Sequence, residues 1–325
     1  MKSVTFHGIV AAKQTVYKYL DPTPLRHYPE LSEKLGFQAY VKHENHLPTG
    51  SFKVRGGINF MHNLPKKQRK QGVVTATRGN HGQSIAYAAA QLGVKATIVV
   101  PHGNNPEKNS AMRAYGAELI VHGADFDEAR ELCDTLQSER GLYYVHPGME
   151  TALIHGVGTY SLEIFENLPD INTIIVPIGG GSGVCGAITV AKAINPNVNI
   201  IGVQAENAPA IYRSWKAGKH IETESCNTIA DGLATRVPFP VPFSIIKENI
   251  HDIVLLSEEE FQEGIRMAIR WTHNLAEGAG AASLAAGRKL SDSLAGQNVV
   301  MVMTGANIDY GTLQAVSVSL DFLNE

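Results

Sequence analysis

A glycine-rich segment could bind a phosphate group through its backbone; it consists of Gly179, Gly180, Gly181, Ser182 and Gly183. The apolar run Thr173–Ile178 before it predicts a buried strand, and Val184–Ile194 after it predicts a helix. Backbone N–H groups can converge on an anion here, because glycine has no side chain and the helix dipole adds positive potential. The segment is not a nucleotide-binding P-loop, because no Gly-Lys-Ser/Thr sequence closes it.

The same segment also fits a second class of cofactor. Gly181-Ser-Gly183-Val-Cys-Gly186 matches the dinucleotide fingerprint, and an acidic residue, Glu206, follows at the end of the next predicted strand. Three interpretations of this segment therefore stay open: a nicotinamide dinucleotide site, a site for another phosphate-bearing cofactor, and a purely structural turn.

A lysine with unusual neighbours, Lys53, lies in the segment Thr49-Gly-Ser-Phe52-Lys53-Val-Arg-Gly-Gly57, after a strand and a loop, where a helix is expected to begin. Small and apolar neighbours and the positive end of a helix both lower the pKa of an ammonium group. A free amine at neutral pH can form a Schiff base. The alternative is an ordinary surface lysine at a helix start.

Two more polar turns follow apolar strands. One is Thr75-Ala-Thr77-Arg78-Gly79-Asn80-His81-Gly-Gln83, and the other is Met303-Thr304-Gly305-Ala306-Asn307. Open α/β sheets bind ligands at the carboxyl ends of their strands, so these turns are candidate binding segments. For the first turn, a helix cap formed by Asn80 is the alternative.

The elements that must position these turns alternate between short apolar strands and longer helices. The predicted strands are Ala39–His43, Val73–Ala76, Ala96–Val100, Glu118–His122, Leu142–Val145, Thr173–Ile178, Asn199–Ala205, Asp252–Leu256 and Asn298–Met303. Predicted helices include one from Asn80 to Leu92, one from Pro106 to Gly116, and Phe261–Asn274 behind a capping box at Ser257. This alternation predicts an α/β fold with parallel sheets and helices on both faces.

Composition excludes several classes of protein. The 325 residues are 44% hydrophobic and only 18% charged, which excludes disorder, and the net charge of −3 provides no basic face for nucleic acid or an anionic membrane. No apolar run approaches the ~18 residues that span a bilayer, and the first residues lack a signal-peptide core. The three separated cysteines fit a reducing compartment, so we expect a cytoplasmic protein.

Taken together, the motifs resemble a known family. Thr49–Gly57, Arg78–Gln83, Gly179–Gly183 and Thr304–Asn307 occur in the order and spacing of the fold-type II pyridoxal-phosphate (PLP) enzymes, nearest to the threonine/serine dehydratase and serine racemase branch. Thr23-Pro-Leu25, Thr228–Gly232 and Glu277 extend the resemblance over essentially the whole chain. The chain stops soon after Asn307, so we expect no regulatory domain like that of the long biosynthetic threonine dehydratases.

The resemblance implies an architecture. It is two open parallel-sheet domains of the tryptophan synthase β-like kind, with pyridoxal 5′-phosphate between them. We expect a large domain of residues 1–62 and 147–325 and a small domain of residues 63–146. A homodimer is usual in the family, and the expected partner is a small amino-acid substrate.

The resemblance also implies roles for individual residues. Lys53 would bind the cofactor as a Schiff base and act as the catalytic base, and Phe52 would pack against the pyridine ring. Asn80 would hydrogen-bond the ring 3′-oxygen, Thr304 would meet the ring nitrogen, and the segment Gly179–Gly183 would hold the phosphate. The expected substrate-binding residues are Thr77, Arg78, Gly79, Asn80, His81 and Gln83.

The expected reaction is β-elimination from an L-β-hydroxy amino acid, which yields a 2-oxo acid and ammonium. Its β-substituent stays open: methyl, hydrogen, carboxylate or aryl. Serine racemases carry serine where this chain has Arg78, and a guanidinium is a poor proton relay, so dehydration is favoured over racemisation. Glu206 matches one metal ligand of the racemases, but the aspartate position falls near Tyr212, so we expect no metal site.

Three alternatives remain at this point. A serine racemase-like enzyme shares the same motifs. An NAD-dependent dehydrogenase would use Gly181–Gly186 and Glu206 but would leave Lys53 and Asn80 without a task. A catalytically silent binding protein is the third, because fold alone does not dictate function.

Overall fold

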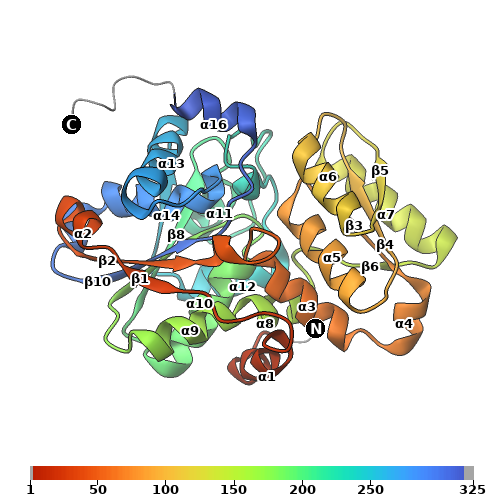
Figure 1. Cartoon of the computed structure of the whole chain (residues 1–325), viewed down its shortest axis with the longest axis horizontal. Helices are drawn as coiled ribbons and strands as arrows, with labels where there is room; N and C mark the ends of the chain where they lie inside the picture. The colour runs from red at the N-terminus through yellow and green to blue at the C-terminus, as the bar shows by residue number, and fades with distance from the viewer. Residues whose placement is uncertain (1–2, 318–325) are drawn as a thin grey trace.

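The protein has two lobes, each built around its own β-sheet (Figure 1). A computed structural model describes residues 3–317. The small lobe, on the right of Figure 1, holds a four-stranded sheet, and the large lobe holds a six-stranded sheet. Strands of the large sheet come from both before and after the small lobe in the sequence, so the chain passes between the lobes twice.

The small lobe is a parallel sheet between helices. Its strands, in the order β5-β4-β3-β6, are β3 (Val73–Ala76), β4 (Ala96–Val100), β5 (Glu118–Val121) and β6 (Tyr143–Tyr144). Its helices are α4 (Lys66–Gln71), α5 (Asn80–Gln91), α6 (Pro106–Ala114) and α7 (Phe126–Arg140). Every residue of β3 and β4 is buried, as expected for strands covered on both faces.

The large lobe has the strand order β1-β2-β10-β7-β8-β9, and all neighbours are parallel except β1 and β2. Its strands are β1 (Leu25–His27), β2 (Gln38–His43), β7 (Thr173–Pro177), β8 (Asn199–Ala205), β9 (Asp252–Leu256) and β10 (Asn298–Met303). Its helices are α1 (Phe6–Val16), α2 (Pro29–Leu35), η1 (Glu44–His46), α3 (Lys53–Asn63), α8 (Thr151–Val157), α9 (Thr159–Asn167), α10 (Ser182–Ile194), α11 (Ala210–Ala217), η2 (Asp231–Leu233), α12 (Pro240–Asn249), α13 (Glu258–Thr272), α14 (Gly278–Lys289), α15 (Ser291–Leu294) and α16 (Tyr310–Ser317).

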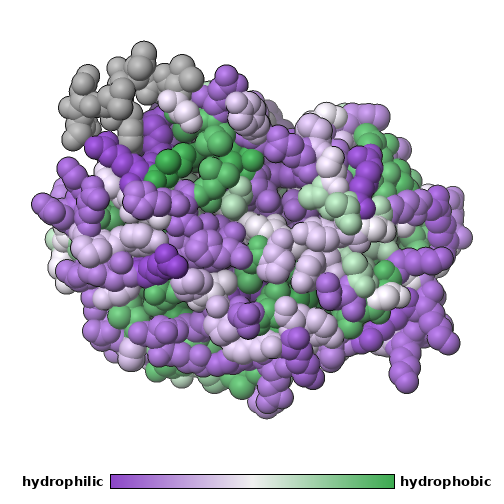
Figure 2. All heavy atoms as spheres, viewed as in Figure 1, coloured by the Kyte–Doolittle hydropathy of each residue, from purple (hydrophilic) through white to green (hydrophobic). Residues whose placement is uncertain are grey.

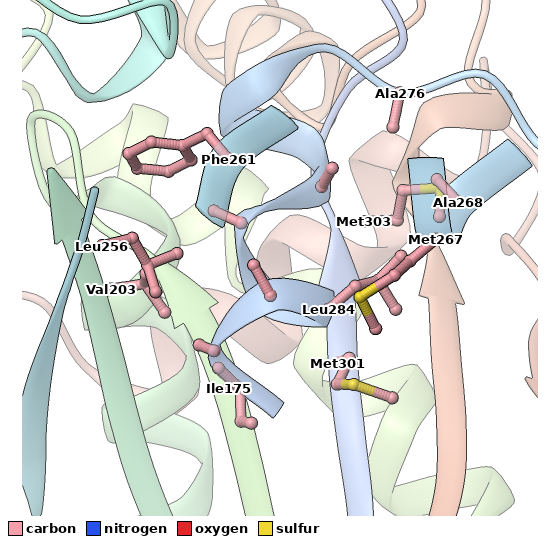
Figure 3. Close-up of a cluster of buried hydrophobic side chains, with 14 of the residues drawn as sticks. Ile175, Val203, Leu256, Phe261, Met267, Ala268, Ala276, Leu284, Met301 and Met303 are labelled. Carbon is pink, nitrogen blue, oxygen red and sulfur yellow. The ribbon is translucent and has the colours of Figure 1, made fainter. Parts of the chain in front are cut away.

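An apolar core on each face of the large sheet fixes where its strands end. Figure 3 shows one of these cores, in which Phe261 of α13 and Leu284 of α14 pack over the strands. Met303, the last residue of β10, is fully buried in the same core. Thr304, directly after it, therefore leaves the sheet from a fixed point.

The predicted fold class is confirmed, and the nine predicted strands are present within two residues of their expected ends. Ser257 caps α13 by the predicted capping box, in which its side chain accepts from Glu260 N and its own N–H donates to the Glu260 carboxylate. The antiparallel strand β1 was not predicted, because it has three residues, of which two are exposed.

The surface is mostly hydrophilic with scattered apolar patches on the face shown in Figure 2. Among the described helices, none combines the length and the apolar character that crossing a bilayer requires.

Candidate active site

A cavity of about 410 Å³ lies where the two lobes meet. The large lobe contributes the glycine segment after β7 and Thr304 after β10, and the small lobe contributes the turn after β3. Three of the four segments singled out from the sequence thus meet here at the carboxyl ends of parallel strands. The fourth supplies Phe52 and Lys53 from the start of α3.

Lys53 is the first residue of α3, and its amine lies inside the cavity. Nζ donates a hydrogen bond to Ser182 Oγ at 2.9 Å, and no carboxylate in the described chain pairs with it. Burial lowers the pKa of Lys53 to about 8, in the direction expected from the sequence. A substantial fraction of this amine is therefore neutral near pH 8 and able to act as a nucleophile or base.

The start of α3 is held by a cluster of four buried charges, Lys42, Glu44, Arg55 and Glu163, which we call the buried ion cluster. Arg55 Nε donates to Glu44 at 2.6 Å, and its Nη1 donates to Glu163 at 2.6 Å. Lys42 donates to Glu163 as well. Burial alone would raise the pKa of Glu163, but Arg55 and Lys42 hold it well below its usual value. The cluster has two positive and two negative groups, so it is neutral as a whole.

Close packing of α3 against α5 brings Lys53 next to the turn after β3. A Cβ at Gly57 would lie 2.3 Å from Ser84 Oγ, so only glycine permits this approach. Ser84 Oγ also donates to the carbonyl oxygen of Lys53 at 2.6 Å. The small lobe is thereby fixed directly to the lysine that faces the cavity.

The segment Gly179–Gly183 leaves the sheet at β7 and starts α10. Gly181 has a φ of 92°, a left-handed conformation that favours glycine. A Cβ at Gly179 would lie 2.0 Å from the carbonyl oxygen of Gly232. Within residues 3–317, no group accepts a hydrogen bond from the backbone N–H groups of residues 179–183. Unpaired N–H groups at the start of a 13-residue helix form an anion site.

The turn after β3 presents backbone N–H groups to the cavity. Thr77 Oγ1 accepts from Gly79 N at 3.0 Å and from Gly82 N at 3.2 Å, which orders the turn. His81 Nε2 lies 3.0 Å from Thr75 Oγ1, and burial lowers the pKa of His81 to about 3, so this imidazole is neutral. Arg78 is exposed at the cavity, and its guanidinium has no hydrogen bond or ion pair within the described chain.

Asn80 is held at both ends of its amide. Its Nδ2 donates to Glu277 Oε1, and its Oδ1 accepts from Asn307 Nδ2 at 2.8 Å. The other oxygen of Glu277 accepts from Lys108 Nζ at 3.1 Å, and Lys108 also pairs with Asp231 at 3.2 Å. Sequence reasoning gave no role to Lys108 or Asn307, although Glu277 and the segment around Asp231 belonged to the resemblance.

Two further predicted residues line the cavity. The edge of the Phe52 ring lies 3.3 Å from the position that a Cβ at Gly183 would take, beside the anion site. Thr304 Oγ1 donates to the carbonyl oxygen of Ala279 at 3.2 Å. Its hydroxyl would have to turn toward the cavity before it could donate to a ring nitrogen there.

The structure does not bring every candidate to the cavity. Gln83 is buried on α5 and is not part of the cavity wall, because it lies almost one helical turn beyond Asn80. Glu206 is exposed after β8, away from the cavity, and no group of three metal-ligating side chains occurs in the described residues. A Cβ at Gly186 would lie 2.6 Å from Gly158 Cα, so the third fingerprint glycine serves a helix contact.

The cavity fits pyridoxal 5′-phosphate on three independent features. The unpaired N–H groups of residues 179–183 suit its phosphate. The Lys53 amine, which has no carboxylate partner among residues 3–317, suits its aldehyde. The Asn80 amide suits an anionic ring oxygen.

The family model described as pyridoxal-phosphate dependent enzyme matches residues 16–305. The L-threonine ammonia-lyase of Geobacter sulfurreducens is 40% identical over 310 residues, covering 95% of this chain and 77% of that protein. That of Thermotoga maritima is 38% identical over 313 residues, covering 96% and 78%. The catabolic L-threonine dehydratase TdcB of Staphylococcus aureus (strain N315) is 35% identical over 317 residues, covering 96% and 92%.

Solved structures agree with these matches. Maize serine racemase superposes with a TM-score of 0.92 at 30% identity, covering 97% of each chain. The processed form of threonine deaminase isoform 2 from Solanum lycopersicum gives 0.90 at 32% identity, covering 97% of this chain and 95% of that one. The chain therefore belongs to the pyridoxal-phosphate dependent enzymes of fold type II, with pyridoxal 5′-phosphate as its cofactor.

Proposed function

We propose that this enzyme is an ammonia-releasing lyase that converts L-threonine to 2-oxobutanoate and ammonium, with L-serine as a second substrate. The observation that carries the proposal is the Lys53 amine, which lies inside the cavity and faces the anion site across Ser182, with Asn80 in the same cavity. The L-threonine ammonia-lyases among its relatives support the choice of substrate and the predicted lyase class.

Bound pyridoxal 5′-phosphate supplies an electron sink that acidifies the Cα–H bond of an attached amino acid. Lys53 is the base we assign to that proton, because its pKa of about 8 leaves a substantial fraction of the amine neutral near pH 8. Ser182 Oγ accepts from Nζ and so gives the free amine a defined place beside the anion site. The segment Gly179–Gly183, Phe52, Asn80 and Thr304 are proposed to hold the cofactor.

The start of α5 is the proposed site for the substrate carboxylate. The backbone N–H groups of Arg78, Asn80 and His81 have no acceptor within the described chain. They lie at the positive end of a 12-residue helix, which favours an anion. His81 contributes no charge because it is neutral, so the nearby side-chain cations are the exposed guanidinium of Arg78 and the ammonium of Lys108, whose side chain packs against Gly79. Thr77 and Gly79 shape this turn, whereas Gln83 lies outside the cavity wall.

We propose the domain limits expected from the sequence: 1–62 with 147–325, and 63–146. The first range includes residues 1–2 and 318–325, which lie outside the described residues. Support comes from the chain connections, since α3 ends at Asn63 and β6 ends at Tyr144.

We also propose a cytoplasmic homodimer with a catabolic role. Large apolar side chains stay exposed at Ile269, Leu275 and Tyr310, along α13, just beyond its end and at the start of α16. A homodimer would cover such groups, and light scattering of the purified protein tests it. The catabolic dehydratase of Staphylococcus aureus supports the role.

The test is product formation by the purified protein with added pyridoxal 5′-phosphate. We expect 2-oxobutanoate and ammonium in equal amounts from L-threonine. D-allothreonine, the product of inversion at Cα, should form at less than a tenth of that rate on a chiral column. A racemase would form the isomer as fast as the oxo acid. Failure to release ammonium from either L-threonine or L-serine would overturn the proposal.

A further inference from the structure

We propose that Lys108 is a positioning residue for the cofactor site: it holds Glu277 across the boundary between the lobes, and Glu277 in turn fixes the amide of Asn80. The inference rests on the proposed function only in assigning Asn80 to the cofactor. Lys108 itself has no assigned contact with cofactor or substrate.

The contacts join the two lobes. Lys108 lies on α6 of the small lobe, and Glu277 and Asp231 lie in the large lobe, at the start of α14 and in η2. Lys108 Nζ is 3.1 Å from Glu277 Oε2 and 3.2 Å from Asp231 Oδ2. The side chains of Lys108 and Glu277 are each only 6% exposed, whereas that of Asp231 is 37% exposed. The Lys108–Glu277 pair is thus the buried part of this interlobe contact.

The amide of Asn80 has one orientation that satisfies its neighbours. Glu277 Oε1 needs a donor and takes one N–H of Nδ2, while Asn307 Nδ2 needs an acceptor and takes Oδ1. A flipped amide would place its oxygen against a carboxylate and its N–H₂ against another N–H₂. In the observed orientation the second N–H of Nδ2 is the remaining donor of the amide, with no acceptor among the described residues. That group is a donor, which suits an anionic ring oxygen.

The charge of Lys108 maintains this arrangement. A buried carboxylate is costly without a counter-charge, so Glu277 without the Lys108 ammonium could turn away from Asn80 and leave Nδ2 without its acceptor. Burial alone would lower the pKa of Lys108, but Glu277 and Asp231 raise it above its usual value, so the ammonium persists. Without that ammonium the two amide orientations become closer in free energy.

The test replaces Lys108 with methionine, which keeps the length of the side chain and removes its charge. Titrating apoenzyme with pyridoxal 5′-phosphate, we expect the Kd to rise at least tenfold, and K108R to recover at least half of that change on a logarithmic scale. The matched control is R140M, which removes an exposed ion pair with Glu118 inside the small lobe. It should leave the Kd within twofold. An unchanged Kd in K108M overturns the proposal.

A double-variant cycle separates positioning from general damage. If Lys108 acts through Glu277, E277Q should weaken cofactor binding at least tenfold alone but less than threefold in the K108M background. Independent, multiplying effects overturn the proposal. If K108M does not fold, the single variants E277Q and D231N decide the question. We expect E277Q to raise the cofactor Kd at least tenfold. D231N should raise it less than threefold, because Asp231 does not touch Asn80. Equal effects of these two variants refute the proposal.

These measurements need no substrate. A parent enzyme that binds the cofactor but releases no ammonium would overturn the proposed function and still permit the test of Lys108. Conversely, normal cofactor binding by K108M in an active lyase would refute the role of Lys108 alone.

Discussion

Replacing Arg55 with methionine tests whether the buried ion cluster holds the helix that starts with Lys53. Arg55 is fully buried and donates hydrogen bonds to Glu44, Glu163, Thr159 and Thr23. Its loss turns a neutral cluster into one with a net charge of −1. Glu44, also fully buried, would keep only the hydroxyl of Thr23 as a hydrogen-bond partner for its side chain among the described residues.

Removing one partner of a buried ion pair costs about 3–5 kcal/mol, because the other charge is left without compensation. We expect this loss for R55M in thermal unfolding of the apoenzyme. At roughly 2 °C per kcal/mol for a chain of this size, the Tm should fall by about 6–10 °C. The double variant R55M/E44Q makes the cluster neutral again and should recover at least about half of the loss.

The control is K13M, which removes the surface pair between Lys13 and Glu166, with side chains 29% and 53% exposed. It should cost less than about 1 kcal/mol. If R55M unfolds within about 1 kcal/mol of the parent, or if adding E44Q makes it less stable, charge compensation is not what holds this cluster together.

Four further predictions concern the site. K53A should lose at least ~10²-fold in turnover but still bind the cofactor, and turnover within tenfold of the parent would exclude Lys53 as the base. An amine-reactive reagent should label Lys53 in the apoenzyme with half-maximal rate near pH 8 rather than near its ordinary 10.5, because its neutral form persists to lower pH; a midpoint above pH 10 would contradict this. R78A should lose at least about tenfold in kcat/KM, about 1.4 kcal/mol, and an unchanged value would give Arg78 no part in binding. G179A, whose Cβ would lie 2.0 Å from Gly232 O, should raise the cofactor Kd more than tenfold and lower the Tm, because the backbone must shift to admit the Cβ; an equal Kd would show that the N–H groups keep their places.

Most of the fold was predictable because its central strands, such as β3, β4 and β7, are buried on both faces and are therefore mostly apolar. β3, β4, β8, β9 and β10 match their predicted bounds. β1 was missed because its three residues have no strand pattern of their own, and it is a strand only through its pairing with β2. Nothing in the sequence indicates that β1 runs antiparallel to β2 either.

The site was predictable where residue type and position in the turn dictate chemistry, as at Lys53 and at the segment Gly179–Gly183. It was not predictable where contacts depend on how the lobes meet. Lys108 lies on a helix of the small lobe among polar neighbours, and nothing local distinguishes it from a surface lysine. Gly186 suggested a dinucleotide site, because a glycine required by helix packing looks the same in the sequence as one required by a phosphate.

The contact of Gly57 with Ser84 extends the enzyme's sensitivity to mutation well beyond its polar residues. An alanine at position 57 would bring Cβ within 2.3 Å of Ser84 Oγ, about 1 Å short of ordinary contact. Rotation of the Ser84 hydroxyl would release the carbonyl oxygen of Lys53 but would leave the Ser84 carbonyl oxygen 2.7 Å from the new Cβ, so relief requires α3 to move away from α5. A displacement of about 1 Å in a catalytic group can cost roughly 10²-fold in rate. Natural variants that inactivate this enzyme can therefore arise at positions that carry no functional group at all.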